Sequence, residues 1–298
     1  DDLPLNISRE TLQHNIVLEK IKKAVVNKVL SELKKKSNKE EEEFLKFWNN
    51  FGAVLKEGLC ESSEFREKTL EICRFATSKS DGKLITLSEY LDRVKKNQDK
   101  IYYVIADTYL ASKNSPHLEI FKDKGLEVLL LHDRIDEWLV AHLTEFEGKT
   151  LQSINKGDVD FGEEETEEAK KAKEDLAGEL EGLIKQMQEA LKDHVKEIRV
   201  SHRLTDSPVC LVADDQDMSG HLQRIMKEMG QDIPEAQPVM ELNPEHALIK
   251  RLKEEQDDAQ FSEWSQLLFE QALLAEGGKL KDPGSFVKRL NAMLVKLL

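Results

Sequence analysis

Apolar residues recur at helical spacing through the first quarter of the chain. From Ser8, which can cap a helix, they lie four or five residues apart, and lysines cover the other faces. This pattern predicts a long helix with the apolar positions Leu12, Ile16, Ile21, Val25, Val29 and Leu33. The run Lys34–Asn38 is expected to break it. A second predicted helix opens with Glu40–Glu43, where acidic groups suit the helix dipole, and it carries Phe44, Phe47, Trp48 and Phe51. A third is expected from Phe65 to Phe75.

The hydrophobic period changes after residue 85. Thr86–Glu89 has the sequence of a capping box, which opens a helix. The runs Ile101–Ile105 and Val128–Leu131 are typical of buried strands, and Ser115–Pro116 starts a helix between them that Gly125 ends. Strand, helix and strand within about thirty residues form a βαβ unit, so the two strands are expected to be parallel. Two further elements follow, a short helix at 136–140 and a strand at 151–154.

A change of composition divides the chain. The acidic, glycine-containing segment 156–168 has little to bury and is the expected linker between two domains, 1–155 and 169–298. Beyond it, a charged helix runs to about Val195, and 198–204 and 208–212 predict strands. A helix begins at Asn243–Pro244, and two more close the chain, at 261–274 and 282–298. The predicted fold class is therefore helix-rich α+β or α/β: a three-helix segment with a small βαβ unit, then a mixed α+β domain ending in a helical hairpin.

The charge balance narrows the classes of function. The net charge is −14, whereas binding to nucleic-acid phosphates needs a basic field. No run approaches the roughly 18 apolar residues that a membrane helix needs, and the acidic start is unlike a signal peptide. Cys60, Cys73 and Cys210 are too few and too far apart to predict a disulfide framework or a zinc site. This cysteine usage favours the reducing cytoplasm.

Residues 218–229 form an amphipathic segment with a methionine-rich stripe. The apolar positions of this stripe follow helical spacing on one face, and they are Met218, Leu222, Ile225, Met226 and Met229. A helix that packs on its own core would have such a stripe. However, methionine is frequent on adaptable binding surfaces, and Asp214–Asp215 and Gly230 set the segment apart between loops. Trp138, beside Glu137, has two similar interpretations: it closes the βαβ core or it contacts a partner.

The two final helices also have apolar stripes. The stripe of the first contains Trp264, Leu267, Leu268 and Leu274, and that of the second contains Phe286, Leu290, Met293, Leu294 and Leu297. Two short helices at a chain end cannot bury such faces well by themselves. Pairing with a symmetric copy would give a four-helix bundle with an interface of about 2,000 Å² or more. An intramolecular helical hairpin is the alternative.

Motifs of catalysis and nucleotide binding are lacking. Gly148–Thr150 has the ending of a phosphate-binding loop, but Leu143 stands where such a loop needs glycine. There is no GxGxxG, HExxH or GxSxG motif, and the eight histidines have no metal-ligand spacing. The chain by itself is therefore expected to be neither an enzyme nor a metal-binding protein.

Several segments spread over the whole chain carry a family resemblance. They are Asp2–Gln13, Ser115–Glu119, Val128–Trp138, Arg203–Pro208, Glu241–His246, and Asp282–Pro283 with Leu290–Asn291. In these segments the chain resembles the ATP-driven chaperones of the 90-kDa heat-shock (Hsp90) family, and the bacterial members most closely. The resemblance implies the later part of that family's middle domain followed by its carboxy-terminal dimerisation domain, without the amino-terminal ATPase domain.

The resemblance also implies a role in ATP hydrolysis for two residues. Arg9 matches a family arginine that reaches the γ-phosphate of ATP on the absent domain, and Gln13 lies one turn further along the same helix face. A guanidinium at that place offsets charge during phosphoryl transfer. ATP and Mg²⁺ are thus expected as cofactors of the intact protein, and none of this chain. Taken by its residue type alone, Arg9 is a surface arginine near a helix start.

For the rest of the chain the resemblance implies a stress-response chaperone. It would form a homodimer and bind unfolded or partly folded client proteins, with a 70-kDa heat-shock chaperone as a further partner. Clients are expected to contact the stripe of residues 218–229 together with Glu137 and Trp138, although family members often carry a polar residue where Ala141 stands. The alternative is a passive dimeric scaffold that binds one dedicated partner. An exposed stripe favours the chaperone, and a buried one favours the scaffold.

Overall fold

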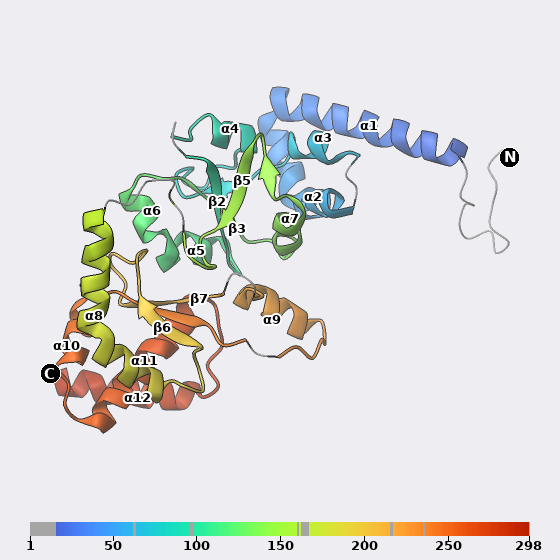
Figure 1. Ribbon diagram of the computed structural model, residues 1–298. Helices are drawn as coiled ribbons and strands as arrows, with labels where there is room; N and C mark the ends of the chain where they lie inside the picture. The colour runs from blue at the N-terminus through green and yellow to red at the C-terminus, as the bar shows by residue number, and fades with distance from the viewer. Residues whose placement is uncertain are drawn as a thin grey trace. The chain divides into compact units, whose positions relative to one another are not determined.

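The computed structural model describes residues 16–61, 64–95, 98–159, 161, 167–214, 217–234 and 236–297. These residues divide into two compact units, one of residues 16–74 with 85–92 and the other of residues 75–84 with 93–297. Helices predominate, and two small mixed sheets both belong to the second unit (Figure 1). The predicted helix-rich α+β class is thereby confirmed. The predicted linker at 156–168 lies only partly within the described residues, and the predicted domain division stays a prediction.

The described residues of the first unit form the helices α1 (Ile16–Lys39), α2 (Glu41–Glu61), α3 (Arg66–Leu70) and α4 (Leu87–Leu91). Its core gathers around α2, where Phe44 and Trp48 are buried and stack with their ring centroids 6.4 Å apart. A Cβ at Gly52 would stand 2.7 Å from the Trp48 ring, so a larger residue there would clash with the indole. The predicted capping box is present: Thr86 Oγ1 accepts from Glu89 N at 3.1 Å, and Glu89 Oε2 accepts from Thr86 N at 2.7 Å.

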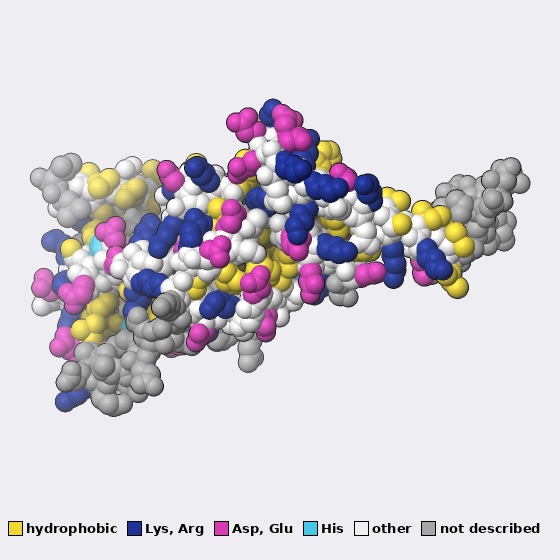
Figure 2. Space-filling view, turned by 90° about the horizontal axis from the view of Figure 1, so that it is seen from above, with side chains coloured by type: hydrophobic (Ala, Val, Ile, Leu, Met, Phe, Trp, Pro, Cys, Tyr) yellow, Lys and Arg dark blue, Asp and Glu magenta, His cyan; other side chains and the backbone are white. Residues whose placement is uncertain are grey.

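The end of α1 differs from its prediction. The run Lys34–Asn38 remains helical, because lysine is a good helix former and the buried Ser37 donates its hydroxyl to the carbonyl of Lys34 at 2.9 Å. The apolar face of α1 is exposed at Ile16, Val17, Ile21, Val25 and Val29. Figure 2 shows hydrophobic and basic side chains side by side along this helix, at the right of the view. α1 therefore presents a surface that is both apolar and basic.

The first sheet of the second unit contains the predicted βαβ unit. β2 (Lys100–Ile105) and β3 (Val128–Leu131) are parallel neighbours, and Tyr102 lies opposite Val128. Their crossover consists of α5 (Tyr109–Lys113), a 3-10 turn (Pro116–Leu118) and α6 (Glu119–Asp123). Ser115 caps the 3-10 turn through a hydrogen bond from His117 N, and Gly125 ends α6 with φ at 60°. The prediction from Ser115–Pro116 and Gly125 is confirmed.

Three more strands complete this sheet. β5 (Lys149–Ser153) runs parallel to β2 on the side away from β3. The short strands β1 (Ala76–Thr77) and β4 (Glu145–Phe146), which the sequence did not predict, pair antiparallel with β3 and β5 and give the order β1-β3-β2-β5-β4. α7 (Asp136–His142) follows β3. Aromatic and aliphatic side chains on one side of the sheet form a core around Tyr102, Phe121 and Leu130.

The described residues of the second sheet form β6 (Glu197–Val200), β7 (Val209–Val212) and β8 (Val239–Leu242), in the order β6-β8-β7. The central strand β8 was not predicted, because it is four residues long and includes the charged Glu241. The strand predicted over 198–204 is too long. It ends at Val200, because Ser201 Oγ accepts from Arg203 N and Leu204 N, both at 3.2 Å, and turns the chain.

Helices surround this second sheet. They are α8 (Glu167–Ala190), α10 (Ala247–Lys253), α11 (Asp258–Ala275) and α12 (Pro283–Leu297). α8 and α11 contribute Met187, Phe261 and Leu268 to a buried core that they share with the strands. α9 (Gly220–Glu228) stands apart from these helices, at the other end of the sheet (Figure 1). Its apolar residues therefore lie outside this core.

Arg203 links the two sheets within the second unit. Its guanidinium donates to the carbonyl of Ile154 at 2.7 Å and to that of Gly157, just after β5, and it pairs with Glu241 of β8 at 2.9 Å. Burial would raise the pKa of the Glu241 carboxyl, but the charge of Arg203 and the hydrogen bonds from Arg199 and Ser201 hold this pKa below its usual value. The buried carboxylate is therefore a charged anchor for the guanidinium.

Candidate functional site

α9 contains Leu222, Ile225 and Met226 of the predicted stripe, whereas Met218 lies before its Ser219 cap and Met229 is the residue that ends the helix. Ile225 is buried, with 4% of its surface exposed, and Leu222 and Met226 are half-buried. Met218 and Met229, at the two ends, are 43% and 61% exposed. α9 therefore packs onto the unit through Ile225 and presents methionine side chains to solvent at both ends.

Glu137 ties α7 to the first turn of α9. Its Oε1 accepts a hydrogen bond from Ser219 Oγ at 2.6 Å and lies 2.9 Å from His221 Nδ1. The Ser219 hydroxyl in turn accepts from Leu222 N at 3.0 Å and so caps the helix. All three side chains, Glu137, Ser219 and His221, are buried. The role of Glu137 as a contact for clients stays a prediction, and its carboxylate already has two partners within the fold.

Asp107 is a second carboxylate that contacts α9, through His221 and Arg224. His221 Nε2 lies 3.4 Å from Asp107 Oδ1, and Arg224 Nη2 donates to Asp107 Oδ2 at 2.8 Å. Arg224 also donates to the carbonyl of Glu276, at the end of α11, at 3.1 Å. Two carboxylates from the first sheet's side of the unit thus meet one histidine and one arginine of α9.

Glu137 lies in a buried part of the second unit. Tyr103, on β2, is nearby, and burial together with the negative charge of Glu137 raises the pKa of Tyr103 to about 12, against the effect of its hydrogen bond with Ser153. A low local polarity strengthens hydrogen bonds to a charged group. The contacts of Glu137 with α9 are therefore stronger than surface ion pairs of the same length.

Trp138 is half-buried on α7. The start of α7 is fixed, because Asp136 Oδ2 accepts from His132 N at 3.1 Å and from Asp133 N at 3.0 Å. Leu139, the next residue after Trp138, is buried. The indole is thus partly accessible, and its contact with a client stays a prediction.

The predicted dimer stripes are only partly on the surface. Leu267, Leu268 and Met293 are buried within the chain, and Leu268 packs in the core of the second sheet. Arg289 of α12 pairs with Glu263 at 2.6 Å and with Glu270 at 2.5 Å on α11. The helical hairpin considered for this region therefore exists. Leu274 and Leu294 are exposed, Phe286 and Leu290 are half-buried, and the side chain of Leu297 lies outside the described residues.

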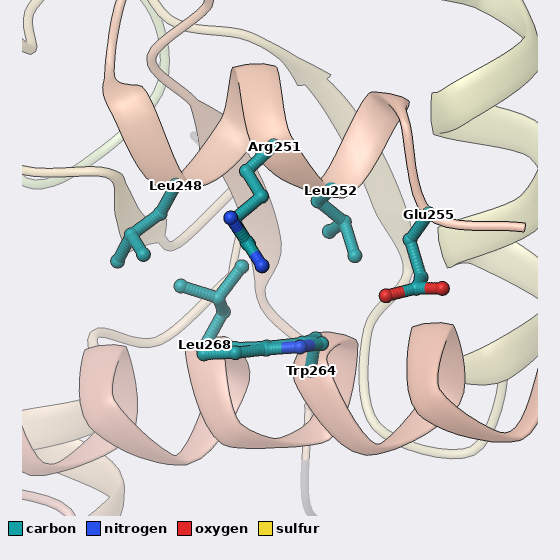
Figure 3. Close-up of a pocket in the computed structure, with 6 residues that line it drawn as sticks. All are labelled: Leu248, Arg251, Leu252, Glu255, Trp264 and Leu268. Atoms are coloured by element: carbon teal, nitrogen blue, oxygen red, sulfur yellow. The ribbon is translucent and has the colours of Figure 1, made fainter. Parts of the chain in front are cut away.

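Trp264 lies in a shallow pocket between α10 and α11. Figure 3 shows Leu248, Arg251 and Leu252 of α10 pointing toward Trp264 and Leu268 of α11, with Glu255 beside them. Trp264 packs against the core of the second sheet. This placement removes Trp264 from the face that α11 and α12 leave exposed.

Two exposed residues of α12 extend that face and were missed in the sequence. Val287 and Val295 are 51% and 72% exposed. With Leu294 they follow the i, i+7, i+8 spacing of one helix face, and this spacing is visible in the sequence. The predicted stripe was centred on Met293, which instead packs inside the hairpin.

Arg9 and Gln13 lie outside the described residues, so their predicted role stays a prediction. Among the residues whose structure is described, no three histidine, cysteine or acidic side chains come together as metal ligands would. Within the same part of the chain, no helix combines the length and the apolar character needed to cross a membrane.

Comparison with known proteins places these features in a family context. The model of the Hsp90 protein family matches residues 1–298. The chain is 50% identical over 299 residues to a protein named chaperone protein HtpG from Pseudoalteromonas translucida, covering all of this chain and 47% of that protein. Its namesakes from Nitrosococcus oceani and Burkholderia ambifaria are 51% and 53% identical, again with 47% of their length covered. The chain spans about half the length of the curated relatives it matches.

Proposed function

The chain belongs to the Hsp90 protein family, and from that premise we propose that it is the client-binding and dimerising part of an ATP-dependent molecular chaperone. Its clients are unfolded or partly folded proteins in the cytoplasm. Relatives that share half of its residues are named chaperone protein HtpG. The resemblance of the whole chain to them supports the chaperone class. The surface of α9 supports client binding, and the exposed face of α11 and α12 supports dimerisation.

The observation that carries the proposal is the exposed methionine surface of α9. Met226 of α9 is half-buried, and Met218 and Met229, which flank the helix, are exposed; none of the three belongs to the core of the second sheet. Methionine is unbranched and polarizable, so such a surface adapts to apolar segments of different shape. The half-buried Trp138 lies on α7, the helix that Glu137 joins to α9, and we assign it to the same client surface.

Dimerisation is assigned to the exposed face of α11 and α12. The apolar residues on this face are Leu274, Val287, Leu294 and Val295. A second copy that brings the same face would cover all of them and form a four-helix bundle by two-fold symmetry. The interface would join two molecules through α11 and α12, the last two helices of the sequence.

ATP hydrolysis is assigned to the intact protein and not to this chain. Arg9 and Gln13 contact the γ-phosphate of the ATP that the family's amino-terminal domain holds together with Mg²⁺. A 70-kDa heat-shock chaperone is a further partner in the same stress response.

Suppression of aggregation tests the client-binding proposal. The parent chain is compared with a variant in which Met218, Leu222, Met226 and Met229 are changed to serine, while the buried Ile225 is kept. A matched control changes Ile16, Ile21, Val25 and Val29 of α1 to serine, which removes a similar apolar area elsewhere. We expect the parent and the control to keep a heat-unfolded client in solution and the α9 variant to fail. Equal protection by all three would refute α9 as the client surface.

The alternative function is a passive dimeric scaffold that binds one dedicated partner. The burial of Ile225 and the hydrogen bonds of Ser219 and His221 favour it, because they hold α9 in one position. If the parent chain protects none of several unrelated clients but forms a dimer, the scaffold is the better description.

A further inference from the structure

Five polar residues link α9 to α7 and to the segment that follows β2. Glu137 contacts Ser219 and His221, and Asp107 contacts His221 and Arg224. His221 lies between the two carboxylates, with one ring nitrogen near each. We call Glu137, Asp107, Ser219, His221 and Arg224 the α9 clamp.

The clamp acts on the backbone of α9 through its cap. Ser219 donates its only hydroxyl proton to Glu137. A lone pair of the same oxygen therefore points to Leu222 N and accepts a hydrogen bond from it at 3.0 Å. Removing the carboxylate frees the hydroxyl to turn and leaves the buried His221 without its nearest acceptor. A buried donor without a partner is costly, so the first turn of α9 would open more often.

The clamp also meets the end of α11. Arg224 donates to Asp107 and to the carbonyl of Glu276, and the next residue, Gly277, approaches Asp107 so closely that a Cβ there would collide with the carboxylate. The position of α9 is therefore linked both to α7, which bears Trp138, and to the turn that leads to α12.

We propose that Glu137 is a positioning residue: it holds the methionine surface of α9 in register with Trp138, so that the two present one composite surface to a client. This inference rests on the proposed client binding. It assigns to the buried carboxylate an action through Ser219 and His221 and no contact with the client. Trp138 and α9 come from segments about eighty residues apart, and the α9 clamp links them through buried side chains.

The contacts outside the clamp are of a different kind. Arg134, just before α7, pairs with Glu228 near the end of α9, but both side chains are well exposed. Exposed pairs contribute little to stability. Arg134→Ala is therefore a matched control, since it removes a link between the same two segments without touching the buried carboxylate.

Hydrogen exchange of the backbone amides tests the clamp without any client. In Glu137→Ala, we expect the amides of 222–229 to exchange about tenfold faster or more than in the parent. The amides of 209–212 and 239–242, in the second sheet, should be unchanged, and Arg134→Ala should resemble the parent. Because Glu137 and His221 act together, Glu137→Ala with His221→Ala should exchange no faster than the faster of the two single variants. Glu137→Gln, which keeps an acceptor oxygen for Ser219, should restore much of the protection.

Client protection supplies the second readout. If Glu137→Ala lowers protection and α9 exchanges faster while the sheet does not, the positioning role stands. If protection falls while α9 exchange stays at the parent's rate, Glu137 contacts the client directly and the inference is wrong. If both α9 and the sheet exchange faster, the residue only stabilises the unit, which also overturns it. Failure of the serine variant of α9 to alter protection would refute the proposed function, and the exchange experiment would still decide whether the clamp exists.

Discussion

Glu119 and Ser207, which are 88 positions apart in the chain, meet through three hydrogen bonds: Glu119 Oε1 accepts from Ser207 Oγ at 2.5 Å, and Ser207 N donates to both carboxylate oxygens at 3.1 Å. The other oxygen accepts from Thr205 N and Asp206 N at 2.7 and 2.8 Å. One carboxylate on α6 thus holds the whole turn that leads into β7. Burial raises the pKa of Glu119, but these hydrogen bonds outweigh it and leave the pKa below its usual value.

This lowered pKa predicts how Glu119→Gln will behave. At neutral pH the variant should be less stable than the parent by about 1–2 kcal/mol, since a half-buried, charged acceptor is lost. The carboxylate's contribution is fully present above the pKa of an unfolded glutamate, about 4.3, and disappears as the pH falls through the lower folded value. Thermal unfolding from pH 7 to pH 3 should show the gap between parent and variant closing at the acid end. A difference in stability that does not change with pH would show that the charge of Glu119 plays no part. Glu245→Gln, which removes an exposed ion pair with Lys250, is the control.

Gly277 should not tolerate a side chain. Its φ is 74°, and a Cβ would collide with Asp107 of the α9 clamp. Gly277→Ala is expected to lose about 1 kcal/mol for the backbone conformation and more for displacing the Asp107 carboxylate from Arg224. Gly230, at a φ of 81° with nothing near its Cβ position, offers the matched control. Equal losses of stability in Gly277→Ala and Gly230→Ala, measured by denaturant unfolding, would mean that the contact with Asp107 has no cost.

Arg203 is expected to be the most sensitive charged residue of the second unit. Arg203→Met would leave Glu241 buried with only the partly exposed Arg199 as a cation, and removal of one partner of a buried pair costs about 3–5 kcal/mol. Arg199→Met removes the other cation of the same carboxylate and should cost much less, because Glu241 keeps its buried partner. Thermal unfolding of both variants gives the comparison. Similar losses would contradict the assignment of Arg203 as the main anchor.

The sequence predicted the regular parts of the fold because their local signals agree with the tertiary structure. The runs Ile101–Ile105 and Val128–Leu131 became parallel strands, and Thr86 forms its capping box. β8 was not predicted because it contains a buried charged residue, Glu241, which is the partner of Arg203. No local pattern in the sequence indicates that a distant arginine will neutralise this charge. The prediction of a helix break at Lys34–Asn38 was wrong. This polar run lacks apolar positions at helical spacing, but its helix propensity and the hydrogen bond of Ser37 continue α1.

The candidate site was predictable to the level of segments but not of contacts. Helical spacing located α9 and the two last helices, but it placed Met218 on α9, which begins only after the Ser219 cap. It could not tell that Met293 faces inward and Val295 outward, because the ion pairs of Arg289 with Glu263 and Glu270 set the rotation of α12. Nor could it tell that Glu137 is buried against Ser219 and His221, since these residues meet only in the folded chain.

Charge placed on the exposed face of α12 should separate the proposed dimer. Val287→Glu with Val295→Glu would set like charges against each other across a two-fold axis and desolvate them, which should weaken self-association by about a hundredfold or more. Both valines are at least half exposed, so the helix itself should form as before, and circular dichroism checks this. Val25→Glu with Val29→Glu, two similarly exposed valines of α1, adds the same charge elsewhere. Sedimentation equilibrium should find a monomer only for the α12 variant. If the α12 and α1 variants associate as the parent does, the exposed face of α12 is not the dimer interface, and if both dissociate, net charge and not this face controls association.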